Sequence, residues 1–153
     1  MRIGIIGAGQ LGQMLGYAAR KLGHECYFLD PSADAPPAAR AGPVLQAGFD
    51  DRVALSILAE KCDVLTYEFE NVPVEALQDI ADKVPVYPPQ DALRLAQDRL
   101  TEKQLFKQLD IPRPQYHQID SADDLRQAVE SIGLPLVIKT RRMGYDGKGQ
   151  FVL

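Results

Sequence analysis

The sequence RIGIIGAGQLGQM, residues 2–14, decides the fold of the N-terminal region. Its first residues are mostly β-branched and stop at a glycine, as in a buried strand. The spacing G-x-G-x-x-G follows, at Gly7, Gly9 and Gly12. Apolar residues then recur at helical spacing, at Leu11, Met14, Leu15, Ala18 and Leu22, until Gly23 ends the helix. A second apolar run at residues 26–29 completes a strand, turn, helix, strand order, which predicts a right-handed βαβ unit.

The alternation of helices and strands continues along the next sixty residues. The sequence predicts an Ala- and Pro-rich loop, a helix, a strand, a second helix and a short strand, at residues 32–43, 51–60, 63–66, 73–80 and 84–86. We therefore expect an α/β fold in which residues 1–95 form a domain with a Rossmann-like parallel sheet.

The pattern weakens around residues 87–89, which places a domain boundary near residues 90–98. The second domain, residues 96–153, is expected to contain a helix to Leu109, a short strand near Tyr116 and a helix opened by a capping box at Ser121. Two strands follow, at residues 134–139 and 150–153. This α+β region is expected to continue beyond the chain, because a hairpin without further strands is marginal in water.

Composition narrows the class of function. The net charge of the 153 residues is −4, which argues against a general nucleic-acid binder. Two cysteines, Cys26 and Cys62, lie at or beside apolar runs and are expected to be reduced core thiols. No apolar stretch approaches the roughly 20 residues that span a bilayer, and no signal-peptide pattern opens the chain. We expect a cytoplasmic protein with neither nucleic-acid nor membrane partners.

The glycine turn is typical of phosphate binding at a helix N-terminus. Asp30 follows Gly12 by 18 residues, where a dehydrogenase holds the ribose of NAD. A pure packing role for the glycines, or another phosphorylated ligand, fits the same spacing. Gln10 offers both a donor and an acceptor at the mouth of the turn.

Two acidic residues follow the strand predicted at residues 63–66. Period-two spacing predicts that Glu68 and Glu70 lie on the same side, at the sheet edge where open α/β folds bind ligands. Either they recognise a hydroxyl or amine of a ligand held by the glycine turn, or they are a solvated strand end with a helix-capping acid.

The segment KTRRMGYDGKGQ, residues 139–150, joins the two C-terminal strands and interleaves glycines with cations. Glycines expose backbone N–H groups, and the cations balance negative charge. The Gly-Lys-Ser/Thr ending of a Walker loop is absent. A mobile cover for nucleotide phosphates is favoured over a solvated hairpin or an RNA-binding loop, for which no aromatic platform is present. Arg142 is expected to be solvated.

A basic strand followed by a glycine loop in a hairpin, all behind a Rossmann-like domain, resembles the ATP-grasp ligases. Four segments together resemble one family among them, the N5-carboxyaminoimidazole ribonucleotide synthases: GQLGQM at 9–14, TYEFENVP at 66–73, DRLTEKQLF at 98–106 and GYDGKGQ at 144–150. The resemblance covers nearly the whole chain. Ala8 departs from the three successive glycines of many relatives, a mild change.

The resemblance implies an activity and its residues. ATP, bicarbonate and 5-aminoimidazole ribonucleotide would give ADP, phosphate and the N5-carboxylated nucleotide, through carboxyphosphate, in de novo purine biosynthesis. Residues implied to contact ATP are Arg99, Lys139, Gly144, Tyr145, Asp146, Gly147, Lys148, Gly149 and Gln150. Those implied to bind the aminoimidazole nucleotide are Gln10, Leu11, Tyr145, Lys148 and one or both of Glu68 and Glu70.

The resemblance also implies what lies outside these residues. The Mg²⁺ ligands and the adenine hinge are expected beyond residue 153, so no metal ligand is assigned and the chain alone is not expected to catalyse the reaction. A homodimer is implied, as is a separate mutase that receives the product. Open alternatives are a formate- or biotin-dependent ATP-grasp ligase, an NAD-dependent dehydrogenase and a non-catalytic nucleotide-binding module.

Overall fold

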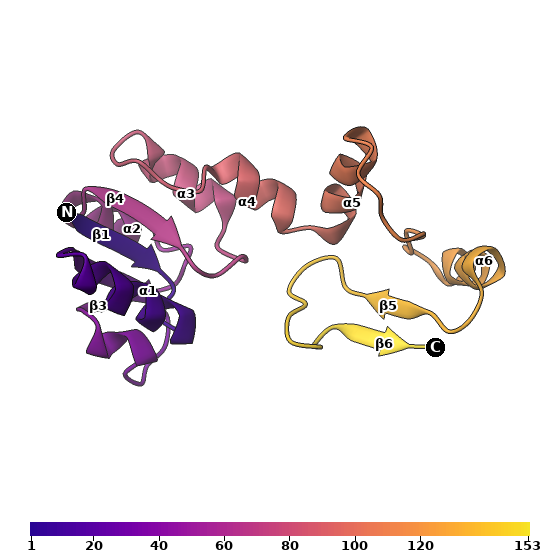
Figure 1. Ribbon diagram of the computed structural model, residues 1–153, viewed down its shortest axis with the longest axis horizontal. Coiled ribbons are helices and arrows are strands. Elements are labelled where there is room, and N and C mark those ends of the chain that lie inside the picture. The colour runs from indigo at the N-terminus through magenta and orange to yellow at the C-terminus, as the bar shows by residue number, and fades with distance from the viewer. The chain divides into compact units, whose positions relative to one another are not determined.

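The computed structural model describes residues 1–153, which fall into two units, Met1–Arg94 and Leu95–Leu153 (Figure 1). Each unit has its own sheet. None of the helices is both long and apolar enough to cross a membrane.

A four-stranded parallel sheet forms the first unit. Its strands are β1 (Arg2–Ile6), β2 (Glu25–Asp30), β3 (Val44–Gln46) and β4 (Val64–Tyr67), in the order β3-β2-β1-β4. The predicted βαβ unit and parallel sheet are confirmed. β3 was not predicted. The expected strand at residues 84–86 is reduced to a single parallel bridge between Leu65 and Val86.

Helices lie between these strands and after β4. They are α1 (Gln10–Lys21), the 3-10 helix η1 (Pro37–Arg40), α2 (Arg52–Lys61), α3 (Val74–Ala81) and α4 (Gln90–Ala96). α2 begins where Asp51 accepts hydrogen bonds from the N–H groups of Val53 and Ala54, both at 3.0 Å. η1 lies within the segment predicted as a loop, and α4 was not predicted.

Successive residues of the central strands enter two separate cores, because side chains alternate across a sheet. Ile6 and Leu29 belong to the larger core, which α2 and α3 supply with Leu55, Leu58, Leu77 and Ile80. Ile5 and Phe28 belong to the smaller core, with Cys26, Ala8, Ala38 and Ala41. Both cysteines are buried free thiols, as predicted.

α1 packs through glycine rather than through its apolar stripe. Gly12 and Gly16 are its buried residues, whereas Leu11 and Met14 are 59% and 61% exposed. A Cβ at Gly16 would lie 2.7 Å from Cβ of Ala41 and 2.8 Å from Cζ of Phe28. The helical spacing of the apolar residues located α1 correctly, but these residues do not form the face that contacts the sheet.

The second unit contains α5 (Arg99–Gln108), α6 (Ala122–Ile132) and an antiparallel hairpin of β5 (Val137–Lys139) and β6 (Gln150–Val152). The capping box is confirmed, since Ser121 Oγ accepts from the Asp124 N–H and donates to its carboxylate. The predicted strand near Tyr116 is wrong. Those residues are irregular, and the Arg113 guanidinium lies 5.6 Å from the centre of the Tyr116 ring.

Candidate functional site

In the first unit, carboxylates accept hydrogen bonds from the N–H groups of the glycine turn. The Ala8 N–H donates to Asp30 Oδ2 at 2.8 Å, and the Gly9 N–H donates to Glu68 Oε1 at 3.2 Å. Gly7 has a φ of +107° and lies so close to Glu68 that a Cβ there would be 2.7 Å from Glu68 Cγ. Because these N–H groups already face negative charge, the turn is poorly suited to accept a pyrophosphate.

Asp30 is an anchor of the turn and not a free ribose ligand. It is 8% exposed, and its second oxygen accepts from the Ser32 N–H at 2.9 Å and from Ser32 Oγ at 2.5 Å. Both carboxylate oxygens therefore have protein partners. This geometry removes the observation on which the dehydrogenase hypothesis depended.

Glu68 and Glu70 differ, although the sequence did not separate them. β4 ends at Tyr67, so the period-two alternation does not extend through either residue. Glu68 is half-buried against the glycine turn, whereas Glu70 is exposed. Burial raises the pKa of Glu68, opposed by the Gly9 hydrogen bond and assisted by the charges of Asp30 and Glu70. Neither glutamate caps the next helix, whose N-cap is Pro73.

Gln10 and Leu11 begin α1 beside this carboxylate-bearing turn. Gln10 lines a cavity of about 520 Å³ with Gln13, Pro37 and Arg40, and Gln13 Nε2 donates to the Pro37 carbonyl at 2.7 Å. Leu11 is exposed. The first unit thus offers an open cavity next to a turn with negative charge.

No role was predicted for Asn71, which follows Glu70. Its amide nitrogen and oxygen are both buried without a hydrogen-bond partner. Buried amides of this kind are uncommon in proteins. In the sequence, the only indication of a role for Asn71 is that it lies in the segment TYEFENVP, residues 66–73.

In the second unit, the cationic loop between β5 and β6 is strongly curled. Met143, Asp146, Gly147 and Gly149 have positive φ, at 61°, 46°, 81° and 67°. The Thr140 N–H donates to the Gly149 carbonyl at 2.8 Å and closes the base of the loop. Lys148 Nζ donates to the Tyr145 hydroxyl at 2.9 Å and lies 4.6 Å from the centre of its ring. Lys139 is exposed on β5, in register with Gln150.

Arg99 reaches the same loop from the start of α5. Its Nη2 donates to the Gly144 carbonyl at 3.0 Å, and its backbone N–H donates to the Arg141 carbonyl at 2.9 Å. The second unit therefore contains Arg99, Lys139 and the glycine loop, three features that the family resemblance implies as ATP contacts.

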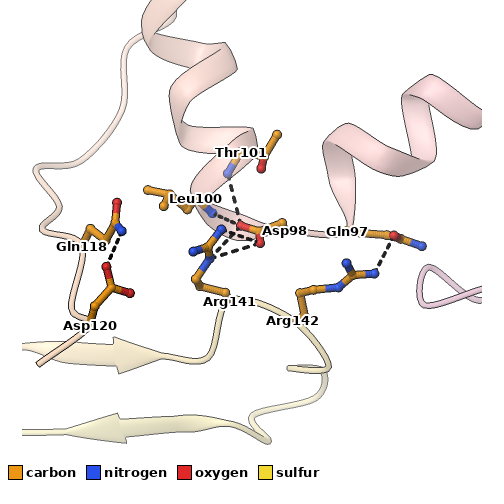
Figure 2. Close-up of polar contacts among 8 residues, drawn as sticks. All are labelled: Gln97, Asp98, Leu100, Thr101, Gln118, Asp120, Arg141 and Arg142. Atoms are coloured by element: carbon orange, nitrogen blue, oxygen red, sulfur yellow. Dashed lines mark hydrogen bonds and ion pairs between the residues drawn. The ribbon is translucent and has the colours of Figure 1, made fainter. Parts of the chain in front are cut away.

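Two further residues, for which no role was predicted, hold the loop (Figure 2). The carboxylate of Asp98 accepts from Arg141 Nε at 3.1 Å and from Arg141 Nη2 at 2.8 Å. Oε1 of Gln97, which is 6% exposed, accepts from Arg142 Nη2 at 2.7 Å. Arg142 is exposed, as expected, but it is not only solvated, because a buried amide 45 residues earlier in the chain accepts a hydrogen bond from its guanidinium.

Residues 1–153 contain no group of three or more His, Cys, Asp and Glu side chains that could hold a metal ion. Besides the carboxylate of Asp146, the polar groups on the loop are cations, hydroxyls and backbone N–H groups, and donors of these kinds suit phosphate oxygens.

Comparison with known proteins gives the class. The model of the ribonucleotide synthetase preATP-grasp domain matches residues 1–97, and the ATP-grasp domain model matches residues 104–153. The chain belongs to the ribonucleotide synthetase preATP-grasp family. The predicted fold class, a Rossmann-like sheet followed by the first part of an ATP-grasp fold, is confirmed.

Individual relatives share one name. N5-carboxyaminoimidazole ribonucleotide synthase of Pseudomonas aeruginosa is 49% identical over 153 residues, all of this chain and 42% of the relative. The crystal structure of N5-carboxyaminoimidazole synthetase from Staphylococcus aureus complexed with ADP matches with a TM-score of 0.91 and 41% identity, over 99% of this chain and 40% of that one.

A third match carries both nucleotides. The N5-carboxyaminoimidazole synthase of Aspergillus clavatus, in complex with ADP and 5-aminoimidazole ribonucleotide, is 30% identical with a TM-score of 0.84, again over 99% and 40% of the two chains. The resemblance inferred from four sequence segments is thereby confirmed. The chain spans about two-fifths of the length of these relatives.

Proposed function

We propose that this chain is the N-terminal part of an enzyme that carboxylates 5-aminoimidazole ribonucleotide with bicarbonate and ATP. ADP, phosphate and N5-carboxyaminoimidazole ribonucleotide are the products, and carboxyphosphate is the activated carrier of the carboxyl group. Residues 1–95 act as the substrate-binding domain, and residues 96–153 begin the ATP-grasp domain. The matched ranges of the two family models and the division into two units support these boundaries.

One observation carries the proposal: in the second unit, Arg99 and the cationic glycine loop form a single hydrogen-bonded group. Arg99 and Lys139 contact ATP, and residues 144–150 cover its phosphates. When bound, ATP with Mg²⁺ supplies the phosphoryl group that activates bicarbonate. The chain's own residues orient the phosphates, balance their charge and exclude water from a short-lived intermediate.

In the first unit, binding of the aminoimidazole nucleotide is assigned to Gln10, Leu11 and Glu68. A contribution of Tyr145 and Lys148 stays a prediction of the family resemblance. We favour Glu68 over Glu70 because Glu68 is half-buried at the glycine turn, and a half-buried carboxylate discriminates ligand donors better than a solvated one. An amine or hydroxyl suits this turn, whereas a pyrophosphate does not.

Particular observations argue against two alternative functions. An NAD-dependent dehydrogenase requires Asp30 to be free and the turn to accept an anion, and neither condition is met. A formate- or biotin-dependent ligase shares the ATP-grasp architecture, but the relatives reported above carry the N5-carboxyaminoimidazole name.

Phosphate release by the full-length protein tests the proposal. We expect ATP hydrolysis that depends on bicarbonate and is stimulated by 5-aminoimidazole ribonucleotide, but not by glycinamide ribonucleotide or biotin. Lys139→Met should abolish the activity. Lys107→Met, at another exposed lysine, on α5, should not. Residues 1–153 alone should show no turnover. Stimulation by glycinamide ribonucleotide, or tight NADH binding, would reject the assignment.

A further inference from the structure

The residue pair Gln97-Asp98 connects the start of α5 to the root of the glycine loop, 43 to 45 residues later (Figure 2). Asp98 receives the Arg141 guanidinium through two nitrogens, and Gln97 receives the Arg142 guanidinium through one. Two adjacent cations of the loop are thus held by two adjacent side chains that directly precede α5.

The Asp98 carboxylate has a second task. Oδ1 accepts the N–H groups of Leu100 and Thr101, at 2.8 and 3.2 Å, and so caps α5. Burial opposes ionisation of Asp98, but the hydrogen bonds from Arg141 and from the two N–H groups outweigh it and lower its pKa. One anionic group therefore orders both the first turn of α5 and the root of the loop.

Arg99 lies between these contacts. Its backbone N–H is bonded to the carbonyl of Arg141, and its guanidinium to the carbonyl of Gly144. The direction of the Arg99 side chain and the position of the loop are therefore set by the same cluster, which we define as the root clamp: Gln97, Asp98, Arg141 and Arg142.

We propose that Asp98 is a positioning residue for ATP: through Arg141 it holds the loop root and Arg99 in one arrangement, so that both meet the triphosphate together. The inference rests on the proposed function. Its basis is the geometry, a two-nitrogen contact between a carboxylate that is 16% exposed and a guanidinium that is 51% exposed. Because the guanidinium is half exposed, solvent screens the ion pair, which therefore contributes little to stability. Orientation is the contribution that substitution should reveal.

Asp98→Asn in the full-length protein separates the two tasks. Asparagine remains a good N-cap, but it cannot present two anionic oxygens to Arg141. We expect the KM for ATP to rise about tenfold, while the KM for the aminoimidazole nucleotide and the melting temperature stay close to those of the wild type. Arg141→Gln should give the same rise.

Two comparisons sharpen the test. The double variant Asp98→Asn/Arg141→Gln should be no worse than either single variant, because both remove one interaction. Asp51→Asn is the matched control, since Asp51 caps α2 through the same kind of carboxylate contact to two N–H groups and has no arginine partner. This control should leave the KM for ATP unchanged. Arg141→Lys should restore the KM only in part, because lysine keeps the charge but not the fork.

The outcomes are distinct. A KM for ATP within twofold of the wild type in Asp98→Asn, or additive effects in the double variant, would overturn the inference and leave the proposed function standing. A fall in melting temperature without a change in KM would reduce Asp98 to a helix cap and overturn it as well. A wild-type protein that does not use ATP would overturn the proposed function, and the inference with it.

Discussion

Asp30→Ala tests whether a carboxylate, and not a bound nucleotide, holds the glycine turn. The substitution leaves the Ala8 N–H buried and without its partner, since Ala8 is fully buried and Asp30 Oδ2 is 2.8 Å away. An orphaned buried donor costs about 1–3 kcal/mol. Ser32, which also loses its bonds to Asp30, is exposed, so water replaces most of that loss. We therefore expect the free energy of unfolding to fall by about 1–3 kcal/mol.

Urea unfolding followed by far-UV circular dichroism measures this loss, and amide hydrogen exchange locates it. Exchange at Ala8 should accelerate in the variant, because its N–H loses its acceptor. Asp34→Ala, in the exposed part of the following loop, is the control and should change neither measurement. A loss below about 0.5 kcal/mol, with Ala8 still protected, would refute the argument that Asp30 anchors the turn.

Three more predictions concern other sites. Burial raises the pKa of Glu68 above its ordinary 4.5, so the folded state binds this proton more tightly than the unfolded state does. Stability should therefore fall as pH rises from about 4.5 through the raised value. Glu68→Gln should remove that dependence in melting curves, and Glu70→Gln should not. Gly149→Ala, at a φ of +67° where a Cβ would meet another side chain, should raise the KM for ATP more than Gly133→Ala, at +87° in open space. Burial raises the pKa of the Cys62 thiol to about 11, so iodoacetamide at pH 8 should label it only after unfolding.

Each of these predictions has a contrary result. Equal pH profiles for the two glutamine variants would remove the distinction between the glutamates. Equal KM values for the two alanine variants would mean that the tight packing at Gly149 does not bear on ATP. Rapid labelling of the native thiol would show that Cys62 is accessible.

The sequence predicted those elements whose signals are local. Three glycines and a β-branched run were enough for β1 and α1, and Ser121 with its capping box was enough for α6. β3 was missed because three residues after Pro43 carry little pattern, and its place is set by pairing with β2. The apolar spacing of α1 gave the helix but not its packed face, because Gly16 lets the sheet approach more closely than a larger side chain would.

The candidate site was predictable in part for the same reason. The glycine loop can be predicted from twelve consecutive residues, 139–150. The residues that hold the loop cannot be predicted in this way. Asp98 and Gln97 lie more than forty residues from Arg141 and Arg142 and contact them only in the folded chain. Asp30 shows the opposite failure: its position predicted a ligand contact, and the fold uses it internally.

The glycine turn comes with its own counter-charge built in. A designer who wished to convert this domain to dinucleotide binding would have to delete the carboxylates of Asp30 and Glu68, because they occupy the donors that a pyrophosphate needs. Deleting Asp30 would also loosen the turn that is meant to receive the new ligand. The glycine spacing is thus shared with dinucleotide-binding proteins. Asp30 and Glu68, which lie outside the glycine motif, restrict the ligands that this turn can bind.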